Sequence, residues 1–540
     1  MSDPASSPPA TSADIEALRQ TIVGLNAHIA ILEEKLRLAV HQRFAPSSEK
    51  LGRVDQPDLF NEAEAVAPAV DEPEPEAPAI TVPEHTRERG KRRPIDAKLP
   101  RIRVEHDIPD AAKTCPCGCT LTRIGETTSE QFDIEPAKAR VIQHVRFKYA
   151  CRTCEGTSLV APSDSPAGSR PEGAKSRGAV VIAALPAQPI PKSNASPGLL
   201  AYIATAKYQD GLPLYRLEGI LARSDIDVSR ATAASWMIRL GQLVTPIINL
   251  MDETQLAYDI LQMDETTVQV LKEAGRDADA KSYMWVRRGG APGQPIILFD
   301  YAATRAASVP MRVLSEYKGY LQADGYAGYN APGRRDGVIA VGCLAHARRK
   351  FHDAVKAQHA VGAPGETGLA PEALAMIRKL YAIEKTAREA KLSAEQRHKL
   401  RDEKARPIWT ELRIWLDRKL GTVPPGSLTG KAMTYLAHEW PRLIRVLDDG
   451  RLEVDNNLCE NAIRPFVMGR KAWLFSDTPR GADASARLYS LIETAKANGL
   501  VPYDYLKRLF AELPAATTLA DIEALLPWTV AQPATPSVAA

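Results

Sequence analysis

The chain has 540 residues, of which 44% are hydrophobic and 25% are charged, so it is neither wholly disordered nor fibrous. Its length allows several hydrophobic cores, and we expect three or more domains. The net charge is only +3, so nucleic-acid binding has to be argued from local basic patches. No apolar run approaches the roughly 20 residues that span a bilayer, and the N-terminus lacks a secretory pattern, which predicts a cytoplasmic protein without membrane contact.

A heptad repeat runs through residues 12–42. Its seam is aliphatic: Ile15, Ile22, Ile29 and Leu36 stand at a, and Leu18, Leu25, Leu32 and Ala39 at d. Alternating spacings of three and four keep this seam on one face, and Ile at a with Leu at d favours a parallel two-stranded coiled coil. The alternative is an amphipathic helix packed on its own domain. We expect self-association, because the Pro-rich flanks offer no neighbouring core.

A linker is predicted over residues 48–100. Ala, Pro and acidic residues dominate it until the basic run "RERGKRRP", a composition that cannot bury enough apolar area to fold. The basic end, with Arg92 and Arg93, either contacts DNA phosphates or is a solvated charge run.

Five of the seven cysteines cluster within residues 115–154. In a reducing compartment such a cluster favours metal over disulfides. The run "CRTC" has the spacing that lets two thiolates reach one tetrahedral zinc, and "CPCGC" offers three more candidates. We predict a structural zinc site in a small β-rich module over residues 101–160, with a strand in "RVIQHVRFKYAC". Four of the five thiols are expected to be its ligands: Cys115, Cys117, Cys119, Cys151 and Cys154. Which two of the first three bind stays open.

A second Pro/Ser/Gly-rich linker over residues 161–196 leads into a helical region over residues 197–252. There "LEGILARSDIDVSRATAASWMIRL" predicts two short helices around a turn, the second opened by Ser229 as N-cap. The pattern resembles a DNA-binding helix-turn-helix, but an ordinary helical hairpin would give it too.

Strand patterns begin after about residue 255. We expect strands in "YDILQMDETTVQVL", "SYMWVRR", "PIILFDYA", "GYLQADGY" and "GVIAVGCLAH", and a helix over about 305–317. Three strands, then helix, strand, helix and strand, predict an α/β sheet of mixed direction. Asp264 lies in the first strand and Asp324 at the end of the fourth. Their carboxylates face each other if these strands are neighbours, while Glu265 points to the other face.

A third acid comes from "LEVDNNLCENAIRPFVMGRKAW", residues 452–473. Asp455 can cap a helix whose next turn carries Glu460, with Arg464 a further turn along. Laid across the sheet edge, this helix would bring Glu460 to the two aspartates and complete a cation site of the kind used in two-metal phosphoryl transfer. A solvated helix with ordinary ion pairs is the alternative.

Five runs resemble those of the insertion sequence 66 family of bacterial DDE transposases: "QMDETTVQVL", "QADGYAGY", "GCLAHARRKF", "VDNNLCENAIRPFVMGRKAWLF" and "YSLIETAKANGLVPYDYL". The resemblance covers nearly the whole chain, although "CPCGC" departs from the family's usual C-x-x-C opening. It implies a multidomain α/β protein with an RNase H-like catalytic core over residues 255–357 and 450–500. A helical insertion over residues 358–449 divides the core, and a helical segment and tail over residues 501–540 follow it.

The resemblance also implies the chemistry. The DDE triad maps to Asp264, Asp324 and Glu460, which would hold two Mg²⁺ or Mn²⁺ ions, with Asp264 bridging both. The implied reaction is cleavage at the ends of the element and transfer of a 3′-hydroxyl into target DNA, without a covalent protein–DNA intermediate. Implied partners are the element ends, target DNA, further copies of the chain in a homodimer or higher oligomer, and accessory proteins encoded by the element. The implied location is the nucleoid of the bacterial cytoplasm.

Basic residues near the triad are candidates for phosphate contacts, because consecutive bases beside an active-site strand are costly unless a polyanion neutralises them. They are Arg348, Arg349, Lys350, Arg464, Arg470 and Lys471. Two alternative functions stay open. One is a DNA-binding protein without catalysis, and the other is an RNase H-like nuclease that cuts without joining.

Other residues near the triad have alternative interpretations. His346 either orients the scissile phosphate or is a helix-start histidine satisfied by backbone. Cys343 has zinc-like spacing from His346, but we expect buried packing because no second ligand pair is evident. Asp300 and Asp455 are rival carboxylates. Three aromatic residues are interpreted as core: Trp285, Trp473 and Phe475.

Overall fold

The computed structural model describes residues 12–44, 139–145, 148–150, 180–182, 186–359 and 368–531. The chain forms two compact units, residues 71–140 and the remainder, and nearly all described elements belong to the remainder. The five clustered cysteines, Arg92 and Arg93 lie outside the described residues. The zinc ligands and the basic end of the linker therefore stay predictions.

A five-stranded sheet lies at the centre of the larger unit. Its strands are β3 (Ile260–Gln269), β4 (Lys281–Gly289), β5 (Ile296–Ala302), β6 (Gly319–Gln322) and β7 (Val338–Val341), in the order β5-β4-β3-β6-β7. The pairs β3/β4 and β4/β5 are antiparallel, whereas β3/β6 and β6/β7 are parallel. The predicted sheet of mixed direction is confirmed.

The connection from β6 to β7 differs from the expected helix. Helix α7 (Ser308–Val313) precedes β6, but two 3₁₀ turns, Ala327–Tyr329 and Pro332–Arg334, fill the next interval. Four glycines and a proline stand in "DGYAGYNAPGRRDG", and these residues disfavour a continuous helix.

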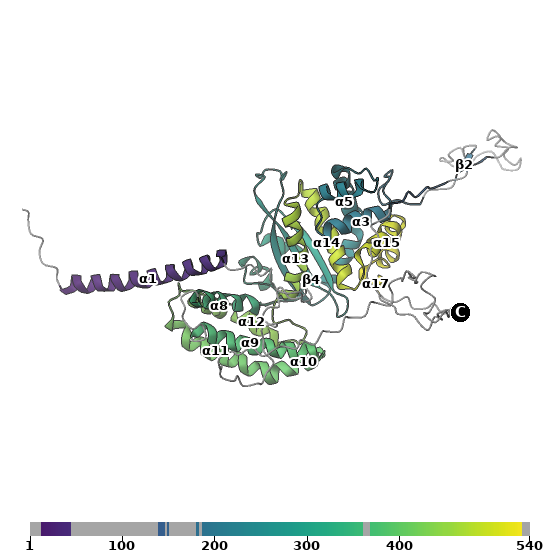
Figure 1. Cartoon of the computed structure of the whole chain (residues 1–540). Helices are drawn as coiled ribbons and strands as arrows, with labels where there is room; N and C mark the ends of the chain where they lie inside the picture. The colour runs from purple at the N-terminus through teal and green to yellow at the C-terminus, as the bar shows by residue number, and fades with distance from the viewer. Residues whose placement is uncertain are drawn as a thin grey trace, which may run out of the picture. The chain divides into compact units, whose positions relative to one another are not determined.

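Helices cover one face of the sheet. Helices α13 (Asn457–Trp473) and α14 (Pro479–Ala497) pack on it, and α3 (Pro197–Tyr208), α5 (Arg230–Leu243) and α15 (Pro502–Glu512) pack beside α14 (Figure 1). Strand alternation sends Val268, Met284 and Val286 into this core, while Met263 and Trp285 enter a second core on the other face.

Helix α14 also satisfies the outer edge of the sheet. The backbone N–H of Ile297 in β5 donates to Thr494 Oγ1 at 2.9 Å, and that of Phe299 donates to Ser490 Oγ at 2.8 Å. Both hydroxyls are buried, so they replace the missing neighbouring strand and close this edge to further pairing.

The region expected to be helical over 197–252 contains α3, α4 (Leu214–Ala222), α5 and α6 (Thr245–Leu256). Ser229 caps α5, because its Oγ accepts a hydrogen bond from Thr232 N at 3.2 Å. The predicted N-cap is confirmed, and a DNA-binding role for the α4–α5 pair stays a prediction.

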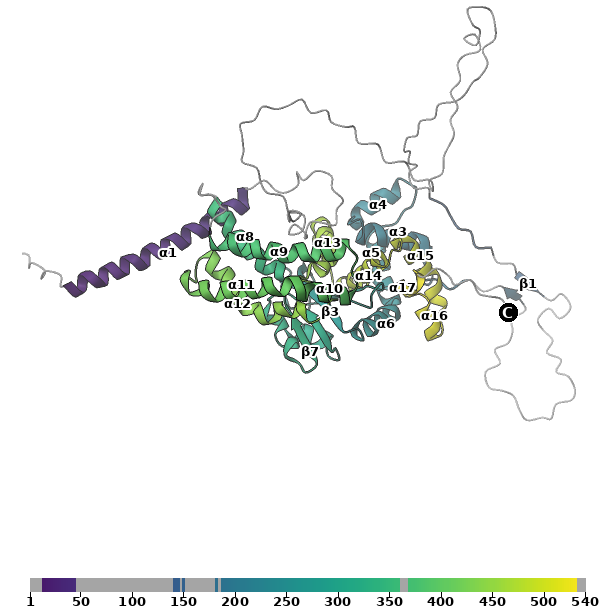
Figure 2. The same ribbon diagram turned by 90° about the horizontal axis from the view of Figure 1, so that it is seen from below.

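Helices between β7 and α13 form a core of their own. They are α8 (Leu344–His359), α9 (Leu369–Glu389), α10 (Ala394–Leu400), a π-helical turn (Arg401–Ala405), α11 (Arg406–Lys419) and α12 (Leu428–Leu443), which lie side by side in Figures 1 and 2. Phe351, Ile377 and Trp409 are among its buried residues. This core is separate from the two that sandwich the sheet.

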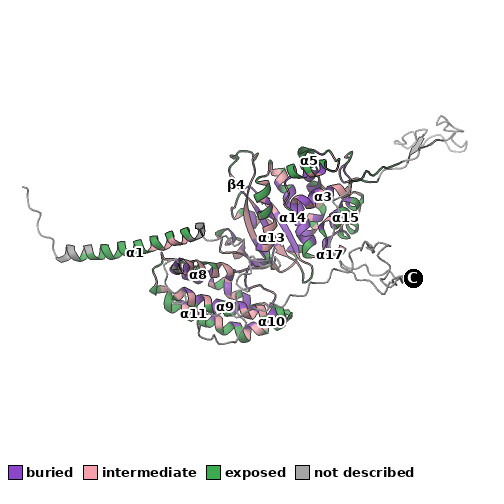
Figure 3. Cartoon of the chain, in the orientation of Figure 1, coloured by how far each residue is buried: buried purple, intermediate pink, exposed green. Residues whose placement is uncertain are grey.

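Helix α1 (Ser12–Phe44) spans the heptad repeat as one continuous helix. From Ile22 to Ala39 the seam residues are exposed, with Ile22 54% exposed and Leu25 57% exposed, and Figure 3 shows exposed residues along the middle of the helix. The seam is therefore available for pairing, which stays a prediction.

Two short strands fall within and after the residues predicted to form the zinc module. Strand β1 (Lys148–Ala150) pairs antiparallel with β2 (Val180–Ile182), which falls in the stretch expected to be a linker. Residues 139–145 are not in a strand, so the strand expected in "RVIQHVRFKYAC" is shorter than predicted.

Two of the three aromatic residues interpreted as core lie in or against the core, and the third does not. Trp285 is fully buried and Trp473 packs against the main core, but Phe475 is 43% exposed and its assignment to the core was wrong. It follows the end of α13, where Leu474 has a positive φ and the chain turns outward.

The C-terminal part ends with α16 (Leu519–Glu523) and α17 (Pro527–Val530). Among the described helices, none has the length and apolar character needed to cross a bilayer.

Helices α5 and α14 cross closely at Gly241. A Cβ there would lie 2.7 Å from Ala484 Cα, and Arg487 Nη1 donates to the Gly241 carbonyl at 2.9 Å. Gly241→Ala should therefore destabilise the protein by about 1–3 kcal/mol despite alanine's higher helix propensity. Thermal unfolding would measure this loss.

Gly219→Ala in α4 is the matched control. Gly219 is exposed, and a Cβ there would meet no atom within 4 Å among the described residues, so this variant should be as stable as wild type or slightly more stable. Equal unfolding temperatures for the two variants would contradict the tight crossing.

Candidate active site

The two aspartates predicted as metal ligands lie on neighbouring parallel strands. Gln262 of β3 pairs with Gln322 of β6, and the same register continued by two residues sets Asp264 beside Asp324. Both side chains are half-buried. Because side chains alternate along a strand, the two carboxylates lie on the sheet face that α13 covers.

The start of α13 is bonded to β3 directly beside Asp264. Asn456 Nδ2 donates to the Met263 carbonyl at 2.8 Å, and the Asn456 backbone N–H donates to Cys343 Sγ at 3.2 Å. Glu460 follows one helical turn later and is only 6% exposed. The predicted helix exists, and it places Glu460 where its charge acts on Asp264 and the charge of Asp324 acts on it.

The N-cap of α13 differs from the prediction. Asn456 occupies the cap position and makes no side-chain cap bond, whereas Asp455 stands one residue earlier. The Asp455 carboxylate still accepts a hydrogen bond from the Asn457 backbone N–H at 3.1 Å. It thus satisfies an N-terminal amide from outside the helix.

The three carboxylates concentrate negative charge. Burial raises the pKa of Asp264 well above its usual range, and the charges of Glu265, Glu460 and Asp324 raise it further. Burial also raises the pKa of Glu460, against the opposing effect of Arg349. Such a site is costly when ionised, and a cation would relieve the repulsion.

The donor set fits Mg²⁺ or Mn²⁺. Hard divalent cations prefer carboxylate oxygens, and Asp264, Asp324 and Glu460 are all carboxylates. Asp264 Oδ1 accepts from Glu265 N at 2.8 Å and Asp324 Oδ1 from Tyr326 N at 2.9 Å, which orients both groups. Among the described residues Glu460 Oε1 is buried without a hydrogen-bond partner, as expected for a metal ligand.

Glu265 belongs to the other face of the sheet, as predicted. It accepts from Arg305 Nε at 2.7 Å and from the hydroxyl of Tyr329. Arg305 also lies over the ring of Tyr326, 3.7 Å from its centroid. The sequence analysis missed Arg305 and Tyr329, because only the spatial neighbourhood of Glu265 reveals them.

The predicted phosphate-binding residues occupy two helices. In α8, Arg349 Nη2 lies 3.6 Å from Glu460 Oε2, and Lys350 Nζ lies 4.7 Å from the centroid of the Tyr435 ring. In α13, Arg470 Nη1 donates to Thr267 Oγ1 at 2.9 Å. Arg349, Lys350 and Lys471 are exposed, whereas Arg348 and Arg464 are half-buried.

His346 and Cys343 stand beside the third acid. His346 Nδ1 is 3.7 Å from Glu460 Oε1 and, within the described part of the chain, has no hydrogen-bond partner. This nitrogen is therefore not satisfied by backbone among those residues. Cys343 is buried, as predicted.

The rival carboxylates are engaged elsewhere. Asp300 Oδ2 in β5 accepts from Arg287 Nη2 at 3.1 Å. Asp455 accepts from the Tyr381 hydroxyl at 2.9 Å, and burial raises its pKa to about 6. Asp455 acts on Glu460 only through its charge.

A family model described as "Transposase IS66 family" matches residues 192–484, more than half of the chain, including all three acids. The protein belongs to the IS66 transposase family. Further matches are "zinc-finger binding domain of transposase IS66" over 112–155, "IS66 C-terminal element" over 490–528 and "Transposase C of IS166 homeodomain" over 31–104.

Relatives of similar length occur in Sinorhizobium fredii (strain NBRC 101917 / NGR234). Uncharacterized protein y4qI is 30% identical over 535 residues, which cover 96% of this chain and 92% of the relative. Uncharacterized protein y4jD is 30% identical over 533 residues, with 95% and 96% covered. Family membership makes this a DNA-binding transposase, and the zinc-finger match, which spans all five clustered cysteines, supports a structural zinc ion.

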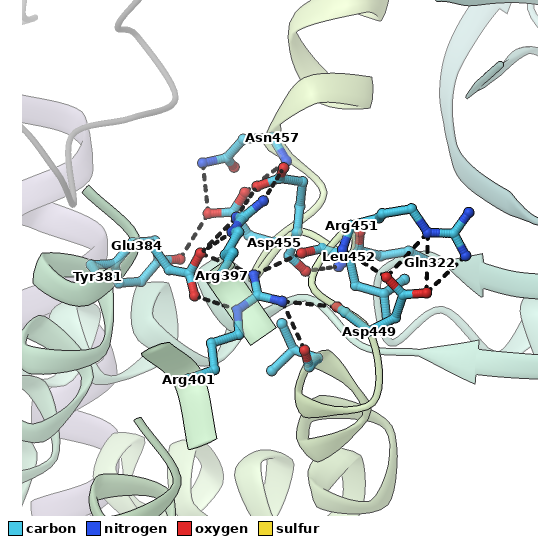
Figure 4. Close-up of polar contacts among 12 residues, drawn as sticks. Gln322, Tyr381, Glu384, Arg397, Arg401, Asp449, Arg451, Leu452, Asp455 and Asn457 are labelled. Carbon is cyan, nitrogen blue, oxygen red and sulfur yellow. Dashed lines mark hydrogen bonds and ion pairs between the residues drawn. The ribbon is translucent and has the colours of Figure 1, made fainter. Parts of the chain in front are cut away.

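A buried guanidinium holds the segment that leads into α13 of the transposase. Arg401 is 1% exposed and donates to both carboxylate oxygens of Glu384, at 2.7 and 2.9 Å (Figure 4). Its other N–H groups donate to the carbonyls of Val446, Asp449 and Leu452, at 2.9, 3.0 and 2.7 Å. All five donors of this guanidinium are used.

Neighbouring contacts extend this network to the sheet. Arg397 bridges Glu384 and Glu453. Arg451 forms a bidentate ion pair with Asp259, the residue just before β3. Gln322 Nε2 donates to the Glu453 carbonyl at 2.7 Å. The helices between β7 and α13 thus fix the chain directly before Glu460.

Removing one partner from this network should be strongly destabilising. Glu384→Gln leaves the buried guanidinium of Arg401 and the half-buried one of Arg397 without their shared counter-ion, and such losses cost about 3–5 kcal/mol. We expect a matching fall in unfolding temperature. A larger dissociation constant for Mn²⁺ is also expected, because the chain before Glu460 would lose its anchor.

Glu403→Gln, in the π-helical turn that carries Arg401, is the matched control. Glu403 is exposed and lies 3.9 Å from Lys399, a surface pair that contributes about 0–1 kcal/mol. If both variants unfolded at the wild-type temperature, the anchoring role of Glu384 would be wrong.

Proposed function

We propose that this transposase is a DDE enzyme that binds the ends of its insertion sequence, cleaves them in a Mg²⁺-dependent reaction and transfers the 3′-hydroxyl to target DNA. The observation that carries the proposal is the acidic site itself: the register sets Asp264 beside Asp324 on the sheet face that α13 covers, and the charge of buried Glu460 on that helix acts on Asp264. The strand order β5-β4-β3-β6-β7, with its antiparallel and parallel halves, supports an RNase H-like core. The helices over 358–449 would then be an insertion between the second and third acids.

Asp264, Asp324 and Glu460 would hold two ions. When bound, two Mg²⁺ ions supply activation of the attacking oxygen and stabilisation of the leaving oxygen in an in-line displacement at phosphorus. The chain's own part is to orient its carboxylates through the amides of Glu265 and Tyr326, and to keep Glu460 in a buried position.

Basic residues around the acids would bind the DNA backbone. Arg349 and Lys350 are exposed on the helix that contacts Glu460, and Lys471 is exposed near the end of α13. Arg349 neutralises Glu460 and is free to turn toward a phosphate once a cation takes over that role. Arg470 is held by Thr266 and Thr267 on β3, which presents it beside the strand of Asp264.

Other regions would select and pair the element ends. The α4–α5 pair is the candidate helix-turn-helix, and the seam of α1 is the candidate dimer contact. Two DNA ends must be joined in one complex, so self-association through α1 suits the reaction. The zinc module would add a further DNA-binding or assembly surface, with four of the five clustered cysteines as ligands.

Glu460→Gln should abolish cleavage of a labelled element-end duplex in Mg²⁺, by about two orders of magnitude or more, while DNA binding persists. The amide keeps the size of the side chain and removes the charge that binds the cation. Cleavage is measured on denaturing gels and binding by fluorescence anisotropy.

Glu411→Gln, at an exposed acid of α11, is the control and should cut at the wild-type rate. Cutting that persisted in Glu460→Gln would exclude Glu460 as the third acid. A wild-type protein that binds the duplex but never cuts it would favour the DNA-binding protein without catalysis. Cutting without strand transfer would favour the nuclease.

Metal binding should strengthen as pH rises. The raised pKa values of Asp264 and Glu460 mean that these acids retain protons above their ordinary values of about 4, and a cation must displace those protons. Without metal, the same raised pKa values lower the stability of the fold as pH rises from the ordinary pKa values toward the raised ones. The reason is that the folded state disfavours the ionised forms.

The Mn²⁺-induced rise in unfolding temperature should therefore be larger at pH 8 than at about pH 5, just above the ordinary carboxyl pKa of about 4. The pH dependence should shrink in Asp264→Asn, which removes the group with the most strongly raised pKa. A rise of the same size at both pH values would contradict proton-linked binding at these acids.

A further inference from the structure

We propose that Cys343, His346 and Glu460 form a second metal site that takes Zn²⁺. Because this site shares Glu460 with the proposed magnesium site, zinc bound there would inhibit the Mg²⁺-dependent reaction. The inhibition rests on the proposed function, whereas zinc binding does not.

The donor atoms are already close together. One ligand atom from each of the three residues lies within 4.8 Å of the others, and His346 Nδ1 is 3.7 Å from Glu460 Oε1. Zinc bonds of about 2.0–2.3 Å bring tetrahedral ligands to roughly 3.5 Å from one another. Small side-chain movements would close the site.

Two of the three candidate ligand atoms have no hydrogen-bond partner among the described residues. Among the described residues neither Glu460 Oε1 nor His346 Nδ1 has a hydrogen bond, and both atoms are buried. An unsatisfied buried polar atom costs about 1–3 kcal/mol, so native structures rarely keep one without a reason. A cation between these two atoms would satisfy both.

The sulfur has the surroundings of a metal-bound thiolate. Cys343 Sγ accepts hydrogen bonds from the backbone N–H groups of Asn456, at 3.2 Å, and of His346. These amides favour the thiolate, but burial and the charges of Asp455 and Glu460 raise the thiol pKa well above its ordinary value. A divalent cation would reverse that balance, because it supplies the missing positive charge.

The donor chemistry selects zinc over magnesium. Sulfur, imidazole nitrogen and one carboxylate oxygen suit Zn²⁺ or Co²⁺, whereas Mg²⁺ prefers oxygen alone. Three protein ligands leave one tetrahedral position open for water. The His346 side chain is 25% exposed and gives an entry path, while Arg349 contacts the other oxygen of Glu460.

Sharing one carboxylate makes the two metals compete. Glu460 Oε1 lies on the His346 side, so zinc would draw this oxygen toward α8 and away from the aspartates. At equal concentrations a site with N and S donors binds Zn²⁺ far more tightly than Mg²⁺. Zinc should thus inhibit at concentrations well below that of the magnesium present.

Binding is tested with Co²⁺ and Zn²⁺ on the full-length transposase, stripped of metal and reloaded. Cys343→Ser should bind one equivalent fewer than wild type and lose part of the sulfur-to-cobalt absorption, while the signal of the zinc module remains. Cys459→Ser is the matched control, because Cys459 is the other buried cysteine among the described residues and lies outside the donor cluster. It should match wild type.

A second variant protects the test against misfolding. If Cys343→Ser does not fold, as judged by circular dichroism, His346→Gln should give the same loss of one equivalent. Equal stoichiometry and equal absorption in wild type and in the folded variants would overturn the proposal.

Inhibition is measured separately, by titrating Zn²⁺ into the Mg²⁺-dependent cleavage of an element-end duplex. The zinc concentration for half inhibition, normalised to each protein's own zinc-free rate, should rise about tenfold or more in Cys343→Ser and stay at the wild-type value in Cys459→Ser. An unchanged value in Cys343→Ser would overturn the inhibitory role. An extra zinc equivalent in a protein that never cuts DNA would reject the proposed function and keep the zinc site. Mg²⁺-dependent cutting by a protein that binds no extra zinc would keep the proposed function and reject the zinc site.

Discussion

The contact between Arg401 and Glu384 is the constraint on which the position of Glu460 depends. A guanidinium and a carboxylate are both costly to bury, and the cost is offset only when every donor and acceptor finds a partner. Here all five N–H groups of Arg401 are satisfied, three of them by carbonyls of the segment that leads into α13. Any displacement of that segment would leave a buried charge incompletely bonded.

This constraint gives the helices between β7 and α13 a structural role at the acidic site. They carry Glu384, Arg397 and Arg401, while the residues they hold belong to the segment just before Glu460. Hydrogen bonds from Gln322 and Asn456 then join the same segment to β6 and β3. Three acids far apart in sequence are thus positioned by one connected polar network.

The same arrangement leaves the third acid with contacts of two kinds. One oxygen of Glu460 faces the guanidinium of Arg349, and the other faces the imidazole of His346 without a hydrogen bond. Its charge acts on Asp264 of β3 and is acted on by Asp324 after β6. On the side of α8 its neighbours are the nitrogen of His346 and the sulfur of Cys343. A hard cation and a softer one therefore find different donor sets around one side chain.

The sequence by itself determined most of the elements and marked the three acids as candidates. Strand alternation placed Asp264 and Glu265 on opposite faces, the heptad gave the extent of α1, and Ser229 marked the start of α5. These features are local, because period, capping and turn chemistry act over a few residues. Long specific runs also pointed to the family. Local patterns failed where glycine and proline interrupted the expected helix between β6 and β7, and where Phe475 followed a turn that exposes it.

The tertiary structure alone decided which side chains meet. That β3 and β6 are neighbours, that Arg349 and His346 contact Glu460, and that Arg305 and Tyr329 bind Glu265 all depend on contacts between distant segments. The network of Arg401 left no signal in the sequence, because a buried arginine in a helix reads like an exposed one until its carbonyl partners are known. Partners of charged groups are set by packing and desolvation across the whole core, and sequence spacing records only the part of that packing that is local.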